Sequence, residues 1–188
     1  VAWYQKKVTI PSDWKGERIL LFLERPHIET TVWVNTKEIG MQNSLCVPHV
    51  YDLTSAVTPG KPCRITIRVD NRIKEINVGP DSHSITDQTQ GNWNGIVGKI
   101  ELQTTPKVYF DDIQVYPDLS NGKALVHMNV KSSSSAKGEI TLSAESFNTD
   151  TRHNVLPVQQ TFRIQAGDNP VEMELPMGKD FLTWDELN

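Results

Sequence analysis

The sequence lacks the features of chains that cross a membrane or bind nucleic acid. No apolar run approaches the roughly 18 residues that a membrane helix needs. No block of Lys and Arg occurs, and 19 basic residues against 23 acidic ones give a formal net charge of -4. Proteins that bind nucleic acid cluster their cations to displace counterions. We therefore expect neither a membrane span nor a nucleic-acid partner.

Cysteine is scarce, and the histidines are scattered. Two cysteines, Cys46 and Cys63, are too few for a disulfide scaffold. They would form one disulfide if their strands were neighbours, although the residues favour two buried free thiols. The five histidines are spaced too widely for a zinc motif, and no glycine-rich loop links a strand to a helix as phosphate binding requires. We expect no metal and no cofactor.

The first residues of the chain do not resemble a targeting segment. The chain opens on Val1 and reads at once as a strand, without an initiator Met or the charged and apolar regions of a signal peptide. A processed mature chain and a piece of a longer protein both fit this pattern, and we favour the second interpretation. The residues themselves leave the localisation unknown.

What the sequence does contain is a two-residue hydrophobic alternation. Residues 64–70 place Ile65, Ile67 and Val69 on one side and polar residues on the other, which predicts a strand with one wet face. The same period recurs in the segments 99–103, 123–131, 139–145, 158–166 and 171–175.

Two segments, 19–23 and 32–34, are apolar on both faces, which is typical of central strands covered on two sides. No sustained 3.6-residue apolar stripe appears. At most one short helical turn is expected, around residues 52–57.

Turn signals separate these runs at short intervals, which predicts an all-β fold of sandwich type. The series of predicted strands is too long for one small sandwich. Pro106 follows one completed strand and precedes another. We therefore predict two β-sandwiches, residues 1–105 and 106–188, the second of immunoglobulin-like size.

Residues 71–98 read neither as strand nor as a short turn. Loops longer than about 12–15 residues are uncommon and are usually functional or disordered. Planar amides, carboxylates and an indole ring are the groups from which sugar sites are made. The candidate substrate-binding residues are Asn92, Trp93, Asn94, Asp87 and His83. A structural role stays open, in which Asn92 and Asn94 satisfy loop backbone and Trp93 plugs the end of the sandwich.

Several motifs in a fixed order resemble the N-terminal region of glycoside hydrolase family 2. The motifs are Ala2-Trp3-Tyr4, Ile10-Pro11-Ser12-Asp13-Trp14-Lys15-Gly16, Val32-Trp33-Val34-Asn35, Tyr51-Asp52-Leu53-Thr54, Ile67-Arg68-Val69-Asp70-Asn71, Gly91-Asn92-Trp93-Asn94-Gly95-Ile96-Val97-Gly98, and Val108 to Pro117. The resemblance covers essentially all of the chain. One departure is Thr36, which stands where the family usually has Gly after the hairpin Asn. A longer hairpin or another turn type is therefore expected there.

The resemblance implies a galactose-binding-like jelly roll over 1–105, an immunoglobulin-like domain over 106–188 and, in family members, a TIM barrel with two catalytic glutamates. A barrel needs about 250 residues, so the catalytic barrel is expected to be absent from this chain. Glu101, Glu139 and Glu145 read as solvent-face residues, and no convincing carboxylate pair is found.

The resemblance thus implies a non-catalytic N-terminal fragment of a retaining β-glycosidase, of β-galactosidase, β-glucuronidase or β-mannosidase type. The parent would be a hydrolase of carbohydrate metabolism, and the fragment alone would be inactive. Its loop 81–95 would reach the edge of the barrel's active site, so its partners would be the C-terminal barrel and the carbohydrate substrate. A periplasmic or extracellular location follows from the resemblance only. A stand-alone carbohydrate-binding module and a structural tandem sandwich are the alternatives.

Overall fold

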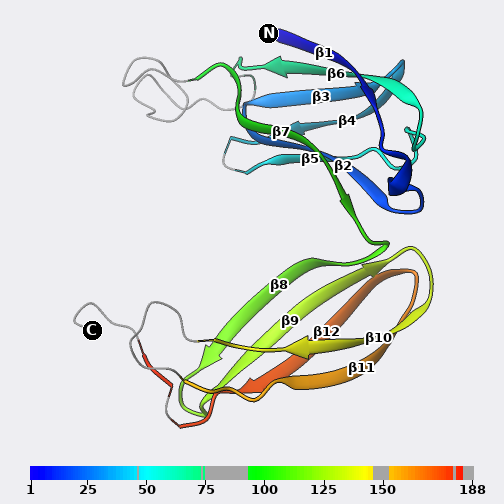
Figure 1. Ribbon diagram of the computed structural model, residues 1–188. Coiled ribbons are helices and arrows are strands. Elements are labelled where there is room, and N and C mark those ends of the chain that lie inside the picture. Colours follow the sequence, from blue (N-terminus) through cyan, green and yellow to red (C-terminus); the bar gives the residue numbers. More distant parts are fainter. Residues whose placement is uncertain (46, 73, 75–92, 146–152, 180, 184–188) are drawn as a thin grey trace. The chain divides into compact units, whose positions relative to one another are not determined.

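The computed structural model describes the chain apart from residues 46, 73, 75–92, 146–152, 180 and 184–188 (Figure 1). The chain divides into two compact units, Val1–Pro106 and Lys107–Asn188. Within the described residues, the one helical element is a single 3-10 turn, η1 (Ser12–Trp14). The rest of the regular structure is antiparallel strand, so the all-β prediction is confirmed.

The first unit is built from two antiparallel sheets (Figure 1). One sheet has the order β1-β6-β3-β4, with β1 (Ala2–Thr9), β6 (Pro62–Asp70), β3 (Glu29–Val34) and β4 (Lys37–Asn43). The other has the order β5-β2-β7, with β5 (His49–Asp52), β2 (Arg18–His27) and β7 (Gly95–Thr105).

Both sheets send apolar side chains into one shared core, which makes this unit a sandwich. The alternating residues Ile65, Ile67 and Val69 of β6 are buried as the pattern predicts. They pack with Leu21 and Leu23 of β2 in the same cluster. The doubly apolar segments are the central strands: β2 lies between β5 and β7, and β3 lies between β6 and β4.

The second unit is also a sandwich. Its sheets have the orders β12-β9-β8 and β10-β11. The strands are β8 (Val108–Asp118), β9 (Lys123–Ser132), β10 (Ala136–Leu142), β11 (Val158–Ile164) and β12 (Gly167–Pro176). Val126, Met128 and Val130 of β9 form the core with Val171 and Met173 of β12, as the two-residue period predicts.

One core prediction in the first unit is wrong for a positional reason. The alternation in 99–103 predicts that Ile100 is buried, but Ile100 is 48% exposed. Strand β7 is the edge of its sheet. Ile100 and Leu102 line an open groove of about 660 Å³ between β7 and β1.

The hairpin between β3 and β4 shows how the chain accommodates Thr36. Val34 pairs with Lys37, so the loop is only Asn35 and Thr36, and the expectation of a longer hairpin is wrong. Asn35 has a φ of 54°, whereas Thr36 is not among the residues of positive φ. A type I′ turn needs positive φ at both residues, so this turn is of another type. The Asn35 side chain accepts a 3.0 Å hydrogen bond from the Arg64 amide of β6.

The expected helical turn at 52–57 is present as a hydrogen-bonded turn rather than a helix. The amides of Ala56 and Val57 both donate to the carbonyl of Leu53. Cys63 is a buried free thiol, and burial raises its pKa. At Cys63 this agrees with the expectation of two buried free thiols, whereas Cys46 lies outside the described residues. The described part of the chain has no helix with the length and apolar character of a membrane span.

Candidate functional site

The site is built where the chain leaves β6 and returns to begin β7. Strand β6 ends at Asp70 and β7 starts at Gly95, so residues 71–94 leave and re-enter the sandwich at neighbouring points. The Asn71 side-chain amide donates a hydrogen bond to the Asn94 side-chain oxygen. This bond joins the departing stem to the returning stem.

The departing stem is held by the Asp70 carboxylate, which is 1% exposed. Arg72 wraps back onto it, with Nε 2.9 Å from Oδ1 and Nη2 2.7 Å from Oδ2. The Arg72 amide also donates to Oδ1, at 3.1 Å. These hydrogen bonds, with that of Lys74, hold the pKa of the Asp70 carboxyl far below its usual range. Asp70 is therefore ionised and cannot serve as a general acid near neutral pH.

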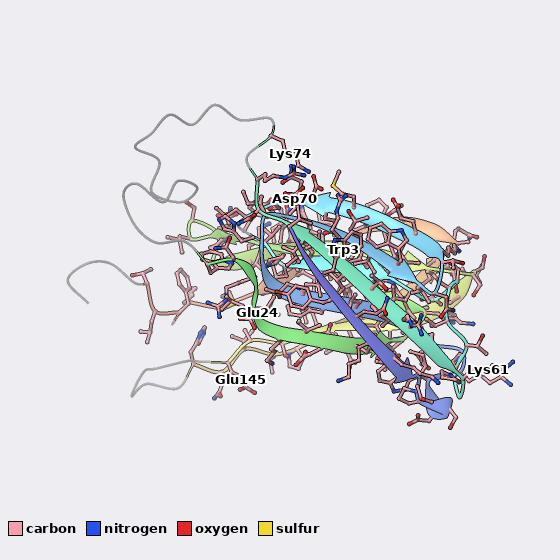
Figure 2. All side chains as sticks on the ribbon, turned by 90° about the horizontal axis from the view of Figure 1, so that it is seen from above. Trp3, Glu24, Lys61, Asp70, Lys74 and Glu145 are labelled. Carbon is pink, nitrogen blue, oxygen red and sulfur yellow. The ribbon has the colours of Figure 1, made fainter. Side chains whose placement is uncertain are left out.

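Lys74 links Asp70 to a second carboxylate, Glu29 of β3. Its Nζ lies 2.9 Å from Asp70 Oδ2 and 3.0 Å from both Glu29 oxygens. Arg68 Nη2 donates to Glu29 Oε1 at 2.6 Å. Three cations thus surround two carboxylates, and Figure 2 shows Asp70 and Lys74 together at this end of the sheet. The network fixes the first turn of the segment to the sandwich.

The returning stem is held by Trp93. Its indole Nε1 donates to the Arg25 carbonyl of β2 at 3.2 Å. The ring meets the buried His27 ring edge-on, with centroids 5.2 Å apart and planes at 74°. Trp93 is nevertheless 37% exposed. One side of the ring therefore packs on β2 while part of it stays open to solvent.

Gly95 explains how β7 begins directly after this stem. Its φ is +87°, a conformation that residues with a Cβ rarely adopt. A Cβ there would also collide with the Tyr4 hydroxyl of β1. Glycine is required at this point on both grounds.

The structure brings together two of the five predicted site residues, Trp93 and Asn94, at one end of the first sandwich. Asn92, Asp87 and His83 lie outside the described residues, so their prediction stays untested.

The sequence patterns did not identify Asp70, Arg72 and Lys74 of the departing stem, nor Glu29 of β3 and His27 of β2. Glu29 carried a usable signal, because a carboxylate at the start of an apolar strand is almost never buried unless it is paired. A second signal was the spacing of charges after the strand. Two cations, Arg72 and Lys74, follow Asp70 by two and four residues. Neither of these two sequence signals indicates which strand lies next to Glu29.

The described groups at this site are amides, an indole face and fixed charges. Amides donate and accept in one plane, and an indole face takes an apolar ring surface. This chemistry suits a polyhydroxylated ligand. Within the ranges that the structure describes, no cluster of three His, Cys, Asp or Glu side chains is arranged to hold a metal ion.

Comparison with known proteins finds relatives that are named β-glucuronidases. A β-glucuronidase of Paenibacillus borealis is 24% identical over 153 residues, which cover 74% of this chain and 26% of the relative. The human β-glucuronidase is 26% identical over 164 residues, which cover 75% of this chain and 25% of the relative. The chain therefore spans about a quarter of the length of these curated relatives.

Solved structures agree in fold. A Bacteroides uniformis β-glucuronidase superposes with a TM-score of 0.71 at 22% identity, covering 92% of this chain and 21% of that one. A glycosyl hydrolase family 2 member from Bacteroides cellulosilyticus gives 0.68 at 18% identity, covering 94% and 24%. The model of the sugar binding domain of glycosyl hydrolases family 2 matches residues 1–106, more than half of the sequence. The chain belongs to glycosyl hydrolase family 2, and its first unit is the sugar binding domain of that family.

Proposed function

We propose that this chain is the non-catalytic N-terminal part of a longer retaining β-glycosidase of carbohydrate metabolism. The observation that carries the proposal is the family match over 1–106 in a chain that spans about a quarter of its relatives. Those relatives are named β-glucuronidases. We therefore take a β-glucuronide as the substrate of the longer protein.

The carboxylates of the site support a non-catalytic role. A retaining glycosidase needs a nucleophile and an acid/base carboxyl about 5–5.5 Å apart, and the acid needs a raised pKa. The pKa of Asp70 is lowered instead. Glu29 is held by Arg68 and Lys74. Both carboxylates act as structural anions, and the catalytic pair is expected on a barrel elsewhere in the longer protein.

The loop 81–95 is proposed to meet the substrate at the edge of that barrel's active site. Asn92, Trp93 and Asn94 are the main contact residues in this proposal, with Asp87 and His83 contributing less. The anchored stems support it, because a loop that touches substrate must have fixed ends. The Trp93 side chain is partly exposed, so part of its ring is accessible for such a contact.

Open apolar grooves in each unit are a further support. In the first unit a groove of about 660 Å³ lies between β1 and β7. In the second, a groove of about 450 Å³ is lined partly by Ile113, Val115 and Leu119, each more than half exposed. Exposed apolar surfaces of this kind mark contact with other protein. In our proposal the remainder of the longer protein covers them.

The test compares the 188-residue chain with the longer protein on a panel of aryl β-D-glucuronide, β-D-galactoside and β-D-mannoside substrates. We expect the longer protein to hydrolyse the glucuronide and the chain alone to hydrolyse none, even at high protein concentration. Turnover that copurifies with the chain and disappears in a variant of one of its Asp or Glu residues would refute the proposal. Sugar binding by the inactive chain alone would favour the stand-alone module instead.

A further inference from the structure

In the second unit, strand β8 has an inner face that is left uncovered. Three of its large apolar residues lie opposite buried core residues of β9: Phe110 opposite Val130, Ile113 opposite Met128, and Val115 opposite Val126. Residues that are directly opposite in an antiparallel pair share one face of the sheet. These three side chains of β8 therefore point towards the interior of the sandwich, yet they are 48%, 52% and 58% exposed, respectively.

The uncovered face follows from the widths of the two sheets. One sheet has the three strands β12-β9-β8, whereas the other has β10 and β11 within the described residues (Figure 1). Strand β11 contacts β12, so β10 lies on the side of β8. The buried core residues of this unit come from β9, β11 and β12, and none comes from β8 in the described part of the chain. The two-stranded sheet is therefore too narrow to cover β8.

An open groove of about 450 Å³ marks the place that a further strand would fill. Ile113 and Val115 of β8 line this groove together with Leu142 of β10. Within the described chain, β10 pairs with β11 along one edge, and its opposite edge has no strand partner. The backbone N–H and C=O groups of such a free edge are a template for the addition of a strand.

The chain that follows β12 returns to the same groove. The Met177 amide donates to the Gly122 carbonyl at 2.7 Å, which holds this segment at the turn between β8 and β9. The Phe181 ring lies beside Gly122, and Phe181 and Leu182 both line the groove. The chain spans about a quarter of the length of its β-glucuronidase relatives. The segment that follows residue 188 in a longer protein is therefore close enough along the chain to reach the groove.

We propose that the segment following residue 188 in the longer protein adds a β-strand to the free edge of β10 and covers the inner face of β8. The added strand is about as long as β10, which has 7 residues, and its apolar side chains at every second position face Ile113 and Val115. The inference rests on the part of the proposed function that makes this chain a portion of a longer protein. It deepens that proposal, because it assigns the covering of this groove to one strand.

The experiment measures how fast a maleimide labels a thiol introduced on the uncovered face. Val115→Cys is made in the 188-residue chain, in the longer protein, and in the chain extended by about 25 residues, enough for a turn and at least one strand of ordinary length. Each protein also carries Cys46→Ser, so the buried Cys63 is the one native cysteine left among residues 1–188. We expect labelling to be at least about tenfold slower in the extended chain and in the longer protein, because the added strand must open first.

Gln114→Cys is the matched control, since Gln114 is exposed on the opposite face of the same strand. Its labelling rate should be the same in the extended chain as in the 188-residue chain. Ile113→Cys repeats the measurement at a second position of the inner face, and circular dichroism should show every variant folded. Hydrogen exchange then tests the edge of β10. The β10 amides that do not bond to β11 should exchange at least about tenfold more slowly in the extended chain.

Four outcomes would overturn the proposal. The first is labelling of Val115→Cys at one rate in all three proteins. The second is protection in the longer protein but not in the extended chain, which would assign the covering to a more distant segment. The third is protection already in the 188-residue chain, either as a monomer or as a dimer in sedimentation velocity. The fourth is protection of the thiol without protection of the β10 amides, which would exclude a strand on that edge.

These measurements need no substrate, so they separate this inference from the proposed function. A longer protein that hydrolyses no glycoside but protects Val115→Cys as described would refute the proposed function and leave the added strand in place.

Discussion

At the scale of single residues, Asp70 combines nearly complete burial with a charge. Its carboxylate binds two cationic side chains and one backbone amide. Removing the charge leaves Arg72 and Lys74 without this partner and weakens the hold on the departing stem. Because both cations are partly exposed, water compensates them in part.

We predict that Asp70→Asn lowers the free energy of unfolding by about 1–3 kcal/mol near neutral pH. Since the folded pKa is depressed, this stabilisation is complete above the unfolded pKa, about 3.9, and is lost as the pH falls towards the folded value. Urea unfolding at several pH values measures it, with Asp13→Asn at an exposed position as the control. A difference between parent and variant that stays constant below about pH 4 would contradict this assignment.

At the scale of elements, a buried polar triad connects the two sheets of the first unit. Thr30 of β3 contacts His49 Nδ1 and the Tyr51 hydroxyl of β5, both at 2.6 Å. His49 Nε2 lies 3.0 Å from the Ser44 carbonyl, which can only accept. Nε2 therefore carries the proton, and the Thr30 hydroxyl donates to Nδ1. Burial lowers the pKa of His49 and favours this neutral form.

We predict that Thr30→Val destabilises the chain by about 1–3 kcal/mol, although the two side chains are nearly isosteric. The loss arises because the His49 and Tyr51 polar atoms keep their burial and lose a partner. Thr9→Val, at an exposed position of β1, should change the free energy of unfolding by no more than about 0.5 kcal/mol. Equal effects of the two variants in urea unfolding would show that the triad contributes nothing.

The same triad predicts a response to acid. Burial lowers the pKa of His49, partly offset by its bond to Ser44. The unfolded chain therefore takes up a proton more readily, and stability should fall as the pH drops below the unfolded value of about 6.5. Between about pH 7.5 and about pH 5, His49→Gln should lose less stability than the parent chain does. Identical losses in urea unfolding would rule out His49 as the source.

Strands were predictable wherever one face is buried, as in β6, because every second residue is then apolar and faces the core. Edge position was not predictable, and for that reason the exposure of Ile100 differs from its pattern. The site was predictable only in its residue types. Trp93 and Asn94 stood out within a polar loop, whereas the clamp on Asp70 depends on Glu29, which is distant in sequence and adjacent only through the β3–β6 register.

At the scale of the whole molecule, the family assignment and the fold agree. Two β-sandwich units account for the described chain, and the family match covers the first of them. In our proposal, this chain supplies a substrate-contacting loop, and another part of the longer protein supplies the catalytic carboxylates. Anchored stems at Asp70 and Trp93 are what such a loop requires.

The most direct test is kcat/KM of the longer protein for an aryl β-D-glucuronide, measured for Asn92→Ala beside Asn43→Ala, an exposed amide at the end of β4. The proposal predicts that Asn92→Ala lowers kcat/KM by a factor equivalent to about 1–3 kcal/mol. It also predicts that Asn43→Ala has no effect and that the stability of the 188-residue chain changes by no more than about 1 kcal/mol in either variant. Unchanged kinetics in Asn92→Ala, together with a chain that unfolds, would contradict the proposal and assign the loop a structural role.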